Sequence, residues 1–360
     1  MPRNSRPEGG VRVLHVDSGR EFRGGQNQAR LLARELAREP GVEQRLVTRR
    51  GSELARRAAA EGVAVREIPW ALGLDPRAWW RLVAEARTWP PDLIHAHNNH
   101  AVTVAIWARR FLAFASTPPR VVATRRVVFP IRRGSALRHA DAVVAISEAV
   151  RATLLAAGVR PGDVHVVPSG IDPDEVRRAA AVPLDLRAKL GLPRGAPIAA
   201  NVAALEPAKD QHTLIRAARA ARAGRPDLHW VIAGDGPERQ ALAAEVRRLD
   251  LADRVHLIGY VAQADALLRE CDVVVMSSRA EGLGTVVLHA LALGKPVVAT
   301  AGGGLAEIVP PRWLVPVRDG DALARRVIEA LDHPSPIPLP QQYTASAMAA
   351  GVLAVYRSLV

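Results

Sequence analysis

The chain of 360 residues contains a single cysteine, Cys271, beside an apolar segment. A lone thiol excludes internal disulfides and cysteine-ligated metal centres, and it is typical of a reducing compartment. No apolar run approaches the ~18–20 residues that a membrane-spanning helix needs. Residues 1–10 also lack the apolar stretch of a secretory signal and are expected to be a disordered lead-in. We therefore expect a cytoplasmic protein.

Aromatic residues make up only 4% of the chain, and three lysines stand against 46 arginines. With so few aromatic side chains, no zinc-ligand spacing and no RNP-like motif, nucleic acid is not an expected partner. Residues 1–168 hold 27 Arg and Lys against 15 Asp and Glu, whereas residues 169–360 hold 22 against 21. The basic half suits an anionic glycan, a lipid-linked acceptor or an acidic membrane surface. An arginine-rich composition that merely decorates solvated faces is the alternative.

Short apolar strands alternate with helical segments along the whole chain, which predicts parallel sheets covered on both faces. The length fits two domains, with a hinge at the turn-forming segment 168–174. The predicted fold class is α/β, with two Rossmann-like doubly wound domains facing across a cleft. The expected strands lie near 11–16, 45–48, 63–68, 92–96, 120–124, 141–146, 163–167, 197–203, 228–233, 254–258, 272–276 and 296–300, and the helices include 26–38 and 345–358.

Residues 271–300 carry the clearest chemistry. They read as an apolar strand, a turn with Glu281, a helix that begins near Thr285, and a second strand. This pattern places a carboxylate beside Gly282 and Gly284 at the carboxyl end of a parallel strand, where open α/β sheets bind ligands. The first N–H groups of the helix suit an anion. An acid beside an anion site is typical of a ligand that is part sugar and part phosphate.

Three further turns bear on ligand binding. Gly24 and Gly25 precede a helix whose N-terminus could hold a phosphate, although a plain turn is the alternative. Lys209 stands at the start of a helix, the end that disfavours a cation, which makes sense if its ammonium meets a bound phosphate rather than solvent. Gly234–Pro237 is a strand-to-helix turn. No G-x-G-x-x-G fingerprint and no G-x-x-x-x-G-K-[ST] loop occurs, which argues against a dehydrogenase and a P-loop ATPase.

Histidines gather in the sequence HAHNNH over residues 95–100, at the end of the fourth strand. Their spacing raises the question of a metal site. We expect none, because strand alternation should turn His95 away from His97 and no acidic partner follows. A polar group at the strand end is expected instead, with His97 pointing inward. Residues 123–133 carry four arginines, which could clamp an anionic acceptor or form a plain basic loop.

With these segments in order, the chain resembles the retaining glycosyltransferases of family 4, which have the GT-B fold, from about residue 11 to 358. An S-E-A-V-R run at 147–151 adds to the likeness. The resemblance implies an acceptor-side domain at 11–168, a nucleotide-sugar-binding domain at 169–334 and a final helix at 343–360 that packs back on the first domain. It also implies retaining, metal-independent transfer from a nucleotide-diphosphate sugar, a co-substrate rather than a cofactor, to a glycan, lipid-linked or lipopolysaccharide-type acceptor. The basic first half adds the expectation of peripheral placement at the inner face of the cytoplasmic membrane.

The same resemblance assigns roles to residues. It places Glu281 at the hydroxyls of the donor sugar, His97 near the reacting carbon and Lys209 on the diphosphate. The implied acceptor-side residues are Asn98, Arg125 and Arg126. The implied donor-binding residues are Gly24, Gly25, Gly234, Asp235, Gly236, Gly259, Tyr260, Gly282, Leu283, Gly284, Thr285 and His289.

Two positions depart from the family pattern. The second glutamate of the family, which binds the ribose, is His289 here, and the arginine usually paired with the lysine falls at about Ala204. A histidine still donates to or accepts from a ribose hydroxyl. Loss of a cation weakens stabilisation of the leaving diphosphate, for which Arg125, Arg126 or Lys295 are candidate substitutes. The alternatives are a nucleotide-sugar 2-epimerase or hydrolase of the same fold, and a non-catalytic sugar-nucleotide-binding module.

Overall fold

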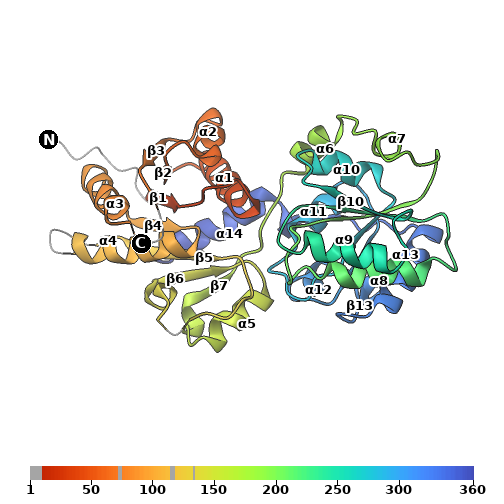
Figure 1. Cartoon of the computed structure of the whole chain (residues 1–360). Helices are drawn as coiled ribbons and strands as arrows, with labels where there is room; N and C mark the ends of the chain where they lie inside the picture. Colours follow the sequence, from red (N-terminus) through yellow and green to blue (C-terminus); the bar gives the residue numbers. More distant parts are fainter. Residues whose placement is uncertain (1–9, 72–74, 114–117, 133) are drawn as a thin grey trace. The chain divides into compact units, whose positions relative to one another are not determined.

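The computed structural model describes residues 10–71, 75–113, 118–132 and 134–360, so that the expected disordered lead-in lies, Gly10 apart, outside the described residues. The chain divides into two compact units (Figure 1). Unit 1 comprises Met1–Gly170 and Gln342–Val360, and unit 2 comprises Ile171–Gln341. Each unit is an α/β domain, which confirms the predicted fold class. Among the described helices, none is both long and apolar enough to cross a bilayer.

Unit 1 contains a parallel sheet of seven strands in the order β3-β2-β1-β4-β5-β6-β7. This is the doubly wound order, in which the chain runs outward in both directions from the neighbouring strands β1 and β4. Ligands of such sheets bind where these two strands end. The strands are β1 (Val11–Asp17), β2 (Val42–Arg49), β3 (Val65–Ile68), β4 (Leu93–Ala96), β5 (Arg120–Arg125), β6 (Ala142–Ala145) and β7 (Val164–Val166).

The last helix of the chain, α14, belongs to unit 1 and packs against α1. Its Met348, Val352 and Tyr356 are buried in one apolar cluster with Leu32 and Leu36 of α1. The helical elements of this unit are α1 (Gly24–Leu36), α2 (Glu53–Ala60), α3 (Pro76–Thr88), α4 (Asn99–Leu112), η1 (Ala136–His139), α5 (Glu148–Ala156), η2 (Pro161–Asp163) and α14 (Ala345–Arg357), with η4 (Gln341–Tyr343) just before α14.

Side-chain caps fix where two helices of unit 1 begin. The Asn98 side chain accepts a hydrogen bond from the N–H of Ala101 at the start of α4, 3.1 Å away. Ser147 accepts from the N–H of Val150 at the start of α5, also at 3.1 Å. Such caps satisfy N–H groups that lack a partner within the helix. Both caps follow a strand directly, so the strand ends and helix starts at this edge of the sheet are fixed by local sequence.

Unit 2 repeats the arrangement with six parallel strands in the order β10-β9-β8-β11-β12-β13. Its ligand edge is therefore expected between β8 and β11. The two-residue strand β13 was not predicted, because so short a segment shows no periodicity. The strands are β8 (Ile198–Val202), β9 (His229–Ala233), β10 (Val255–Gly259), β11 (Val273–Met276), β12 (Val297–Thr300) and β13 (Leu314–Val315).

The helices of unit 2 begin close to the predicted turns. Helix α11 begins at Thr285, as expected, and Pro237 of the predicted strand-to-helix turn lies two residues before the start of α9. The helical elements are α6 (Pro173–Ala180), α7 (Leu186–Lys189), α8 (Gln211–Ala221), α9 (Arg239–Arg248), α10 (Ala264–Glu270), α11 (Thr285–Ala292), α12 (Leu305–Ile308), η3 (Pro311–Trp313) and α13 (Gly320–Asp332).

Candidate active site

Lys209 and Glu281 meet at the ligand edge of unit 2. Lys209 follows β8 and Glu281 follows β11, the two strands at which the chain direction switches. The Lys209 ammonium donates to the Glu281 carboxylate, and the Ser278 hydroxyl donates to the same oxygen at 3.3 Å. The side chains keep 21% and 13% of their surface exposed. Because an ammonium has three donors, a cation and a carboxylate remain available side by side at this edge.

Three consecutive glycines hold the Glu281 turn in place. At Gly302–Gly304, just after β12, an added Cβ would lie 2.0–2.3 Å from the carbonyl oxygens of Ser278, Glu281 and Gly282. The N–H of Gly304 donates to the Glu281 carbonyl at 2.9 Å. Only glycine permits so close an approach of two backbones. Sequence reasoning missed this run, although three glycines directly after a strand are a recognisable signal.

The helix that follows the turn presents its amino end at the same edge. Gly284 has φ +91°, and an added Cβ there would lie 2.7 Å from Leu305. Leu283 is buried and anchors the turn in the core. Thr285 then begins α11, whose first N–H groups have no partner within the helix. Together with Lys209, this helix end provides a positive region suited to an anion.

The Gly234–Pro237 turn packs tightly on the loop after β8. An added Cβ would lie 1.8 Å from the Ala203 carbonyl at Gly234 and 2.4 Å from the Leu205 carbonyl at Gly236, and both glycines have positive φ. The Asp235 carboxylate accepts a hydrogen bond from the N–H of Gly236 at 2.8 Å. These glycines are required because the two loops touch through their backbones. The turn therefore shapes the ligand edge beside Lys209.

His289 forms a pair that sequence reasoning did not anticipate. It lies four residues after Thr285 on α11, and its Nδ1 is 2.6 Å from a carboxylate oxygen of Asp265. Asp265 lies in the first turn of α10, which follows β10 and its last residue Gly259 after the short segment that begins with Tyr260. Tyr260 is 77% exposed. The pair thus links α11 to α10, the helix that follows the implied donor-binding residues Gly259 and Tyr260.

Lys295 does not compensate for the missing arginine. The Lys295 ammonium donates to the carbonyl of Cys271 at 2.8 Å. Both residues precede strands, which places Lys295 at the amino-terminal edge of the sheet, so the prediction that it could replace the missing arginine is wrong. At the other edge, the Ala204 carbonyl accepts from Gln211 at 3.1 Å.

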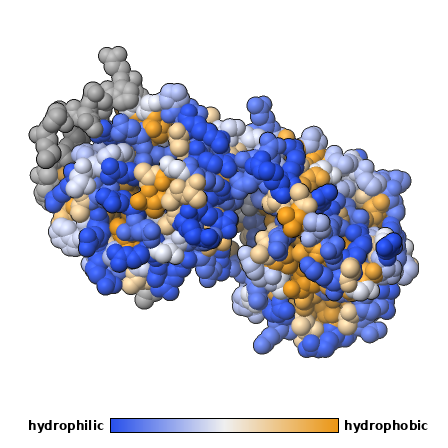
Figure 2. Space-filling view, turned by 90° about the horizontal axis from the view of Figure 1, so that it is seen from above, coloured by the Kyte–Doolittle hydropathy of each residue, from blue (hydrophilic) through white to orange (hydrophobic). Residues whose placement is uncertain are grey.

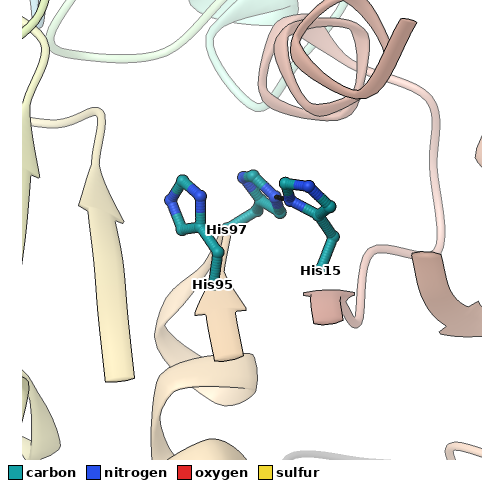
Figure 3. Close-up of side chains that lie close together, drawn as sticks. All are labelled: His15, His95 and His97. Carbon is teal, nitrogen blue, oxygen red and sulfur yellow. Dashed lines mark hydrogen bonds between the residues drawn. The ribbon is translucent and has the colours of Figure 1, made fainter. Parts of the chain in front are cut away.

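Three buried histidines meet at the corresponding edge of unit 1 (Figure 3). His15 of β1 pairs in register with His95 of β4, and His97 follows that strand. The expectation that His95 turns away from His97 is wrong, because side chains two residues apart lie on the same face of a strand. Their ring centroids are 4.3 Å apart. His15 was missed, although a histidine within an otherwise apolar strand was a signal.

Hydrogen bonds engage all three imidazoles. His15 Nδ1 lies 3.0 Å from His97 Nε2. The two nitrogens of His95 lie 2.5 Å from the Tyr356 hydroxyl of α14 and 2.6 Å from the Thr124 hydroxyl of β5. Burial lowers the pKa of each histidine, of His15 to about 4, so the rings are neutral at neutral pH.

The three ligand nitrogens lie within 4.8 Å of one another, a set that could hold a metal ion. Two observations favour a hydrogen-bonded network instead. Both nitrogens of His95 already have partners. The guanidinium of Arg126, whose Nε is buried, donates to the His97 carbonyl at 2.7 Å, and a second cation beside it would be repelled.

Asp17 is a further buried polar group at this edge that sequence reasoning missed. Burial raises the pKa of its carboxyl, whereas the N–H of Gly19 at 2.7 Å, the Gln26 side chain and the charge of Arg126 oppose that rise. Gly25 also lies beside Arg126, since an added Cβ would be 3.9 Å from its Cδ. The glycine pair, the acid and the arginine thus lie together. Perturbed carboxyls at a ligand edge mark candidate functional sites.

The other acceptor-side residues shape the surrounding loops. Arg125 is buried and donates to the carbonyls of Val127 at 3.0 Å and Phe129 at 2.7 Å, which fixes the loop after β5. Asn98, besides capping α4, accepts from the Ser18 hydroxyl at 2.6 Å. The Nε of Arg126 is buried and has no hydrogen-bond partner among the described residues. A buried donor of this kind favours a bound polar group nearby.

Comparison with known proteins gives the family. Residues 184–349 match the family model described as glycosyl transferases group 1, and residues 22–175 match glycosyltransferase family 4. The chain is 30% identical over 357 residues to a 2-deoxystreptamine glucosyltransferase of Streptomyces kanamyceticus, covering 87% of this chain and 90% of that protein. It is 36% identical over 194 residues to a GDP-mannose-dependent monoacylated alpha-(1-6)-phosphatidylinositol monomannoside mannosyltransferase of Corynebacterium glutamicum, covering 49% of each.

Solved structures agree on the fold. The structure of Anabaena Alr3699/HepE in complex with UDP matches with a TM-score of 0.80 at 20% identity, over 97% of this chain and 100% of that one. Its complex with UDP-glucose matches with a TM-score of 0.76 at 22% identity, over 97% and 98%. The resemblance found in the sequence is therefore confirmed, and the chain belongs to the group 1 glycosyl transferases of glycosyltransferase family 4, with the GT-B fold.

Proposed function

We propose that the chain is a retaining, metal-independent glycosyltransferase whose donor is a nucleoside diphosphate sugar bound to unit 2. The Lys209–Glu281 pair carries this proposal. It sets a carboxylate for sugar hydroxyls beside an ammonium and a helix amino end for a diphosphate. Structural neighbours in complex with UDP and with UDP-glucose support such a donor.

The catalytic proposal concerns charge that develops as the glycosidic bond breaks. Negative charge grows on the leaving diphosphate, so Lys209 and the first N–H groups of α11 stabilise the transition state more than the ground state. Glu281 holds the sugar in the reacting orientation. The diphosphate oxygen accepts the proton of the incoming hydroxyl on the same face of the sugar, so that no second catalytic carboxylate is needed and the anomeric configuration is retained. His97 belongs to the acceptor side in this proposal.

The acceptor we propose is a glycan, a lipid-linked glycan or a lipopolysaccharide-type molecule. The basic excess of residues 1–168 favours an anionic acceptor or an acidic membrane surface, and cytoplasmic, peripheral placement on the inner membrane face. The names of two relatives contain two kinds of acceptor, 2-deoxystreptamine and a phosphatidylinositol mannoside. Both present ring hydroxyls, and one is attached to lipid. Nucleic acid is not a proposed partner.

The donor is found with a thermal-shift screen of UDP-, GDP-, ADP- and dTDP-sugars, because a ligand of the folded state raises the unfolding midpoint. The sugar moiety of the donor should raise the unfolding midpoint beyond the increase given by the free nucleotide. Glu281→Gln should abolish this additional increase and leave the increase given by the free nucleotide. Asp321→Asn, which alters an exposed residue, serves as control. Transfer should continue in EDTA, and proton NMR of the product should show the anomeric configuration of the donor. Inversion would overturn the retaining assignment.

Product analysis without acceptor separates the alternatives. A 2-epimerase or hydrolase converts the donor alone, into an epimer or free sugar, whereas the proposed transferase leaves it largely intact. A non-catalytic module binds the nucleotide tightly without turnover of any donor or acceptor. The changes at Ala204 and His289 are the observations that favour this last alternative.

A further inference from the structure

Two neighbouring helices of unit 1 expose aromatic side chains. Over the face drawn in Figure 2, apolar residues form small groups among hydrophilic ones. On α3 and α4, which lie side by side (Figure 1), Trp80 is 52% and Trp107 50% exposed. Phe111 lies one turn after Trp107, with its ring 4.3 Å from Trp79 and 5.8 Å from Trp80, centroid to centroid. We refer to Trp79, Trp80, Trp107 and Phe111 as the α3–α4 aromatic patch.

This concentration is notable for the composition, since the chain has only seven tryptophans and four phenylalanines. Exposed apolar surface on a folded protein marks a contact with a partner more often than chance. Tryptophan is enriched where one side of the ring meets an apolar phase and the indole N–H meets water, as at the surface of a bilayer.

Among the described residues of α3 and α4, the Asp, Glu, Lys and Arg side chains that form no ion pair are all positive. Arg81, Arg87 and Arg110 are exposed and form no ion pair within the described part of the chain. The acid of α3, Glu85, is only 11% exposed and is paired with Arg45 and Arg66, and α4 contains no acid. Arginines of this kind extend their apolar stems along a membrane and place guanidinium groups among lipid phosphates. The patch is therefore complementary to an anionic bilayer in both polarity and charge.

We propose that the α3–α4 aromatic patch docks the protein on the surface of an anionic phospholipid bilayer. The exposed rings of Trp80 and Trp107 enter the headgroup region, Trp79 and Phe111 support them from below, and the exposed arginines contact phosphates. The contact is interfacial, because the described helices include none that could cross the membrane. The proposal rests on the proposed function only for its lipid-linked acceptor. Its test involves no sugar transfer, so that failure of one is distinguishable from failure of the other.

The test is cosedimentation of the full chain with vesicles of phosphatidylcholine alone and with phosphatidylglycerol added. We expect partition only onto the anionic vesicles, with a blue shift of tryptophan fluorescence. The double variant Trp80→Ala/Trp107→Ala should lower the partition coefficient at least tenfold and abolish most of the shift. Arg81→Gln/Arg110→Gln should lower it several-fold, and added salt should lower it further.

Matched controls locate the effect. Phe129→Ala removes an aromatic side chain that is 48% exposed elsewhere in unit 1, and Arg178→Gln/Arg194→Gln removes two exposed charges from unit 2. Both controls should bind vesicles as the native chain does, and all variants should keep its thermal midpoint. Absence of binding of the native chain to anionic vesicles would overturn the proposal. Binding of the Trp80→Ala/Trp107→Ala variant equal to that of the native chain would also overturn it. A dimer by light scattering that the tryptophan variant dissolves, without vesicle binding, would assign the patch to a second copy.

Discussion

The imidazole of His289 donates a hydrogen bond from Nδ1 to the carboxylate of Asp265, 2.6 Å away. When the ring is neutral, a proton shared with the carboxylate sits on Nδ1, and Nε2 carries a lone pair that can accept a hydrogen bond. A carboxylate at position 289 would likewise accept a hydrogen bond. In the proposed donor site, the pair would let His289 offer an acceptor to a ribose hydroxyl, the role that the family resemblance gives to a glutamate at this position.

The first prediction concerns this pair. Asp265→Asn removes the group that fixes the tautomer and should weaken nucleotide affinity about three- to tenfold, since a hydrogen bond of this kind contributes ~1 kcal/mol. The double variant Asp265→Asn/His289→Glu should restore affinity by supplying the acceptor directly. Isothermal titration calorimetry with the nucleotide identified in the screen measures both. Equal affinity of Asp265→Asn and the native chain would contradict the assigned role.

The second prediction concerns Lys209. Lys209→Met removes a cation from the proposed diphosphate site and should lower kcat by about 10²–10³-fold, the range found when one donor to a developing oxyanion is lost. The binding of donor should change less than kcat, because the interaction strengthens as the bond breaks. Lys189→Met, which alters a lysine of α7 away from this edge, is the matched control. A purely structural role would lower the thermal midpoint and leave kcat of the folded fraction unchanged.

The third prediction concerns the packing of the glycine run. Gly304→Ala places a Cβ 2.3 Å from the Gly282 carbonyl, so one backbone must move. Overpacking of this kind costs about 1–3 kcal/mol, and the Glu281 turn is the segment displaced. Urea unfolding should show the lower free energy of unfolding of this variant, and the folded variant should bind the donor more weakly. Gly224→Ala, whose added Cβ meets only Ile328 at 3.6 Å, should leave both unchanged.

The sequence allowed the strands other than β13, the turns at Gly234–Pro237 and Gly282–Gly284, and the position of Glu281 after a strand end to be predicted, because these follow from local periodicity and from the rule for parallel strand ends. It did not predict the ion pair between Lys209 and Glu281, which joins residues 72 positions apart. It did not reveal Asp265 as the partner of His289, since that contact joins residues 24 positions apart on different helices. His15 was missed for the same reason: its contact with His97 spans 82 positions. The prediction that His95 turns away from His97 misapplied strand periodicity, because side chains two residues apart lie on the same face of a strand.

The fourth prediction concerns the loss of folding stability as the pH is lowered. His15 has its pKa lowered by burial from 6.5 to about 4, and burial also lowers the pKa of His95 and His97. Between pH 6.5 and about 4 the unfolded chain binds protons that the folded chain does not, so stability is greatest above pH 6.5 and falls as the pH is lowered through this window. Each such proton contributes about 1.4 kcal/mol per pH unit. The raised pKa of Asp17 acts in the opposite direction, because its folded carboxyl binds a proton more readily than the unfolded one.

Urea unfolding of the whole chain at pH 7.5, 6.0 and 5.0 measures this dependence. The free energy of unfolding should fall more steeply than one histidine alone allows, since three buried imidazoles resist protonation together. His15→Gln removes one of these imidazoles. The slope of the free energy of unfolding against pH should then decrease by an amount that corresponds to about one proton, even though the variant is less stable than the native chain at pH 7.5. His333→Gln alters an exposed histidine and should leave the slope unchanged. A slope that His15→Gln does not alter would show that the imidazole is solvated and titrates normally, against the buried network of β1, β4 and α14.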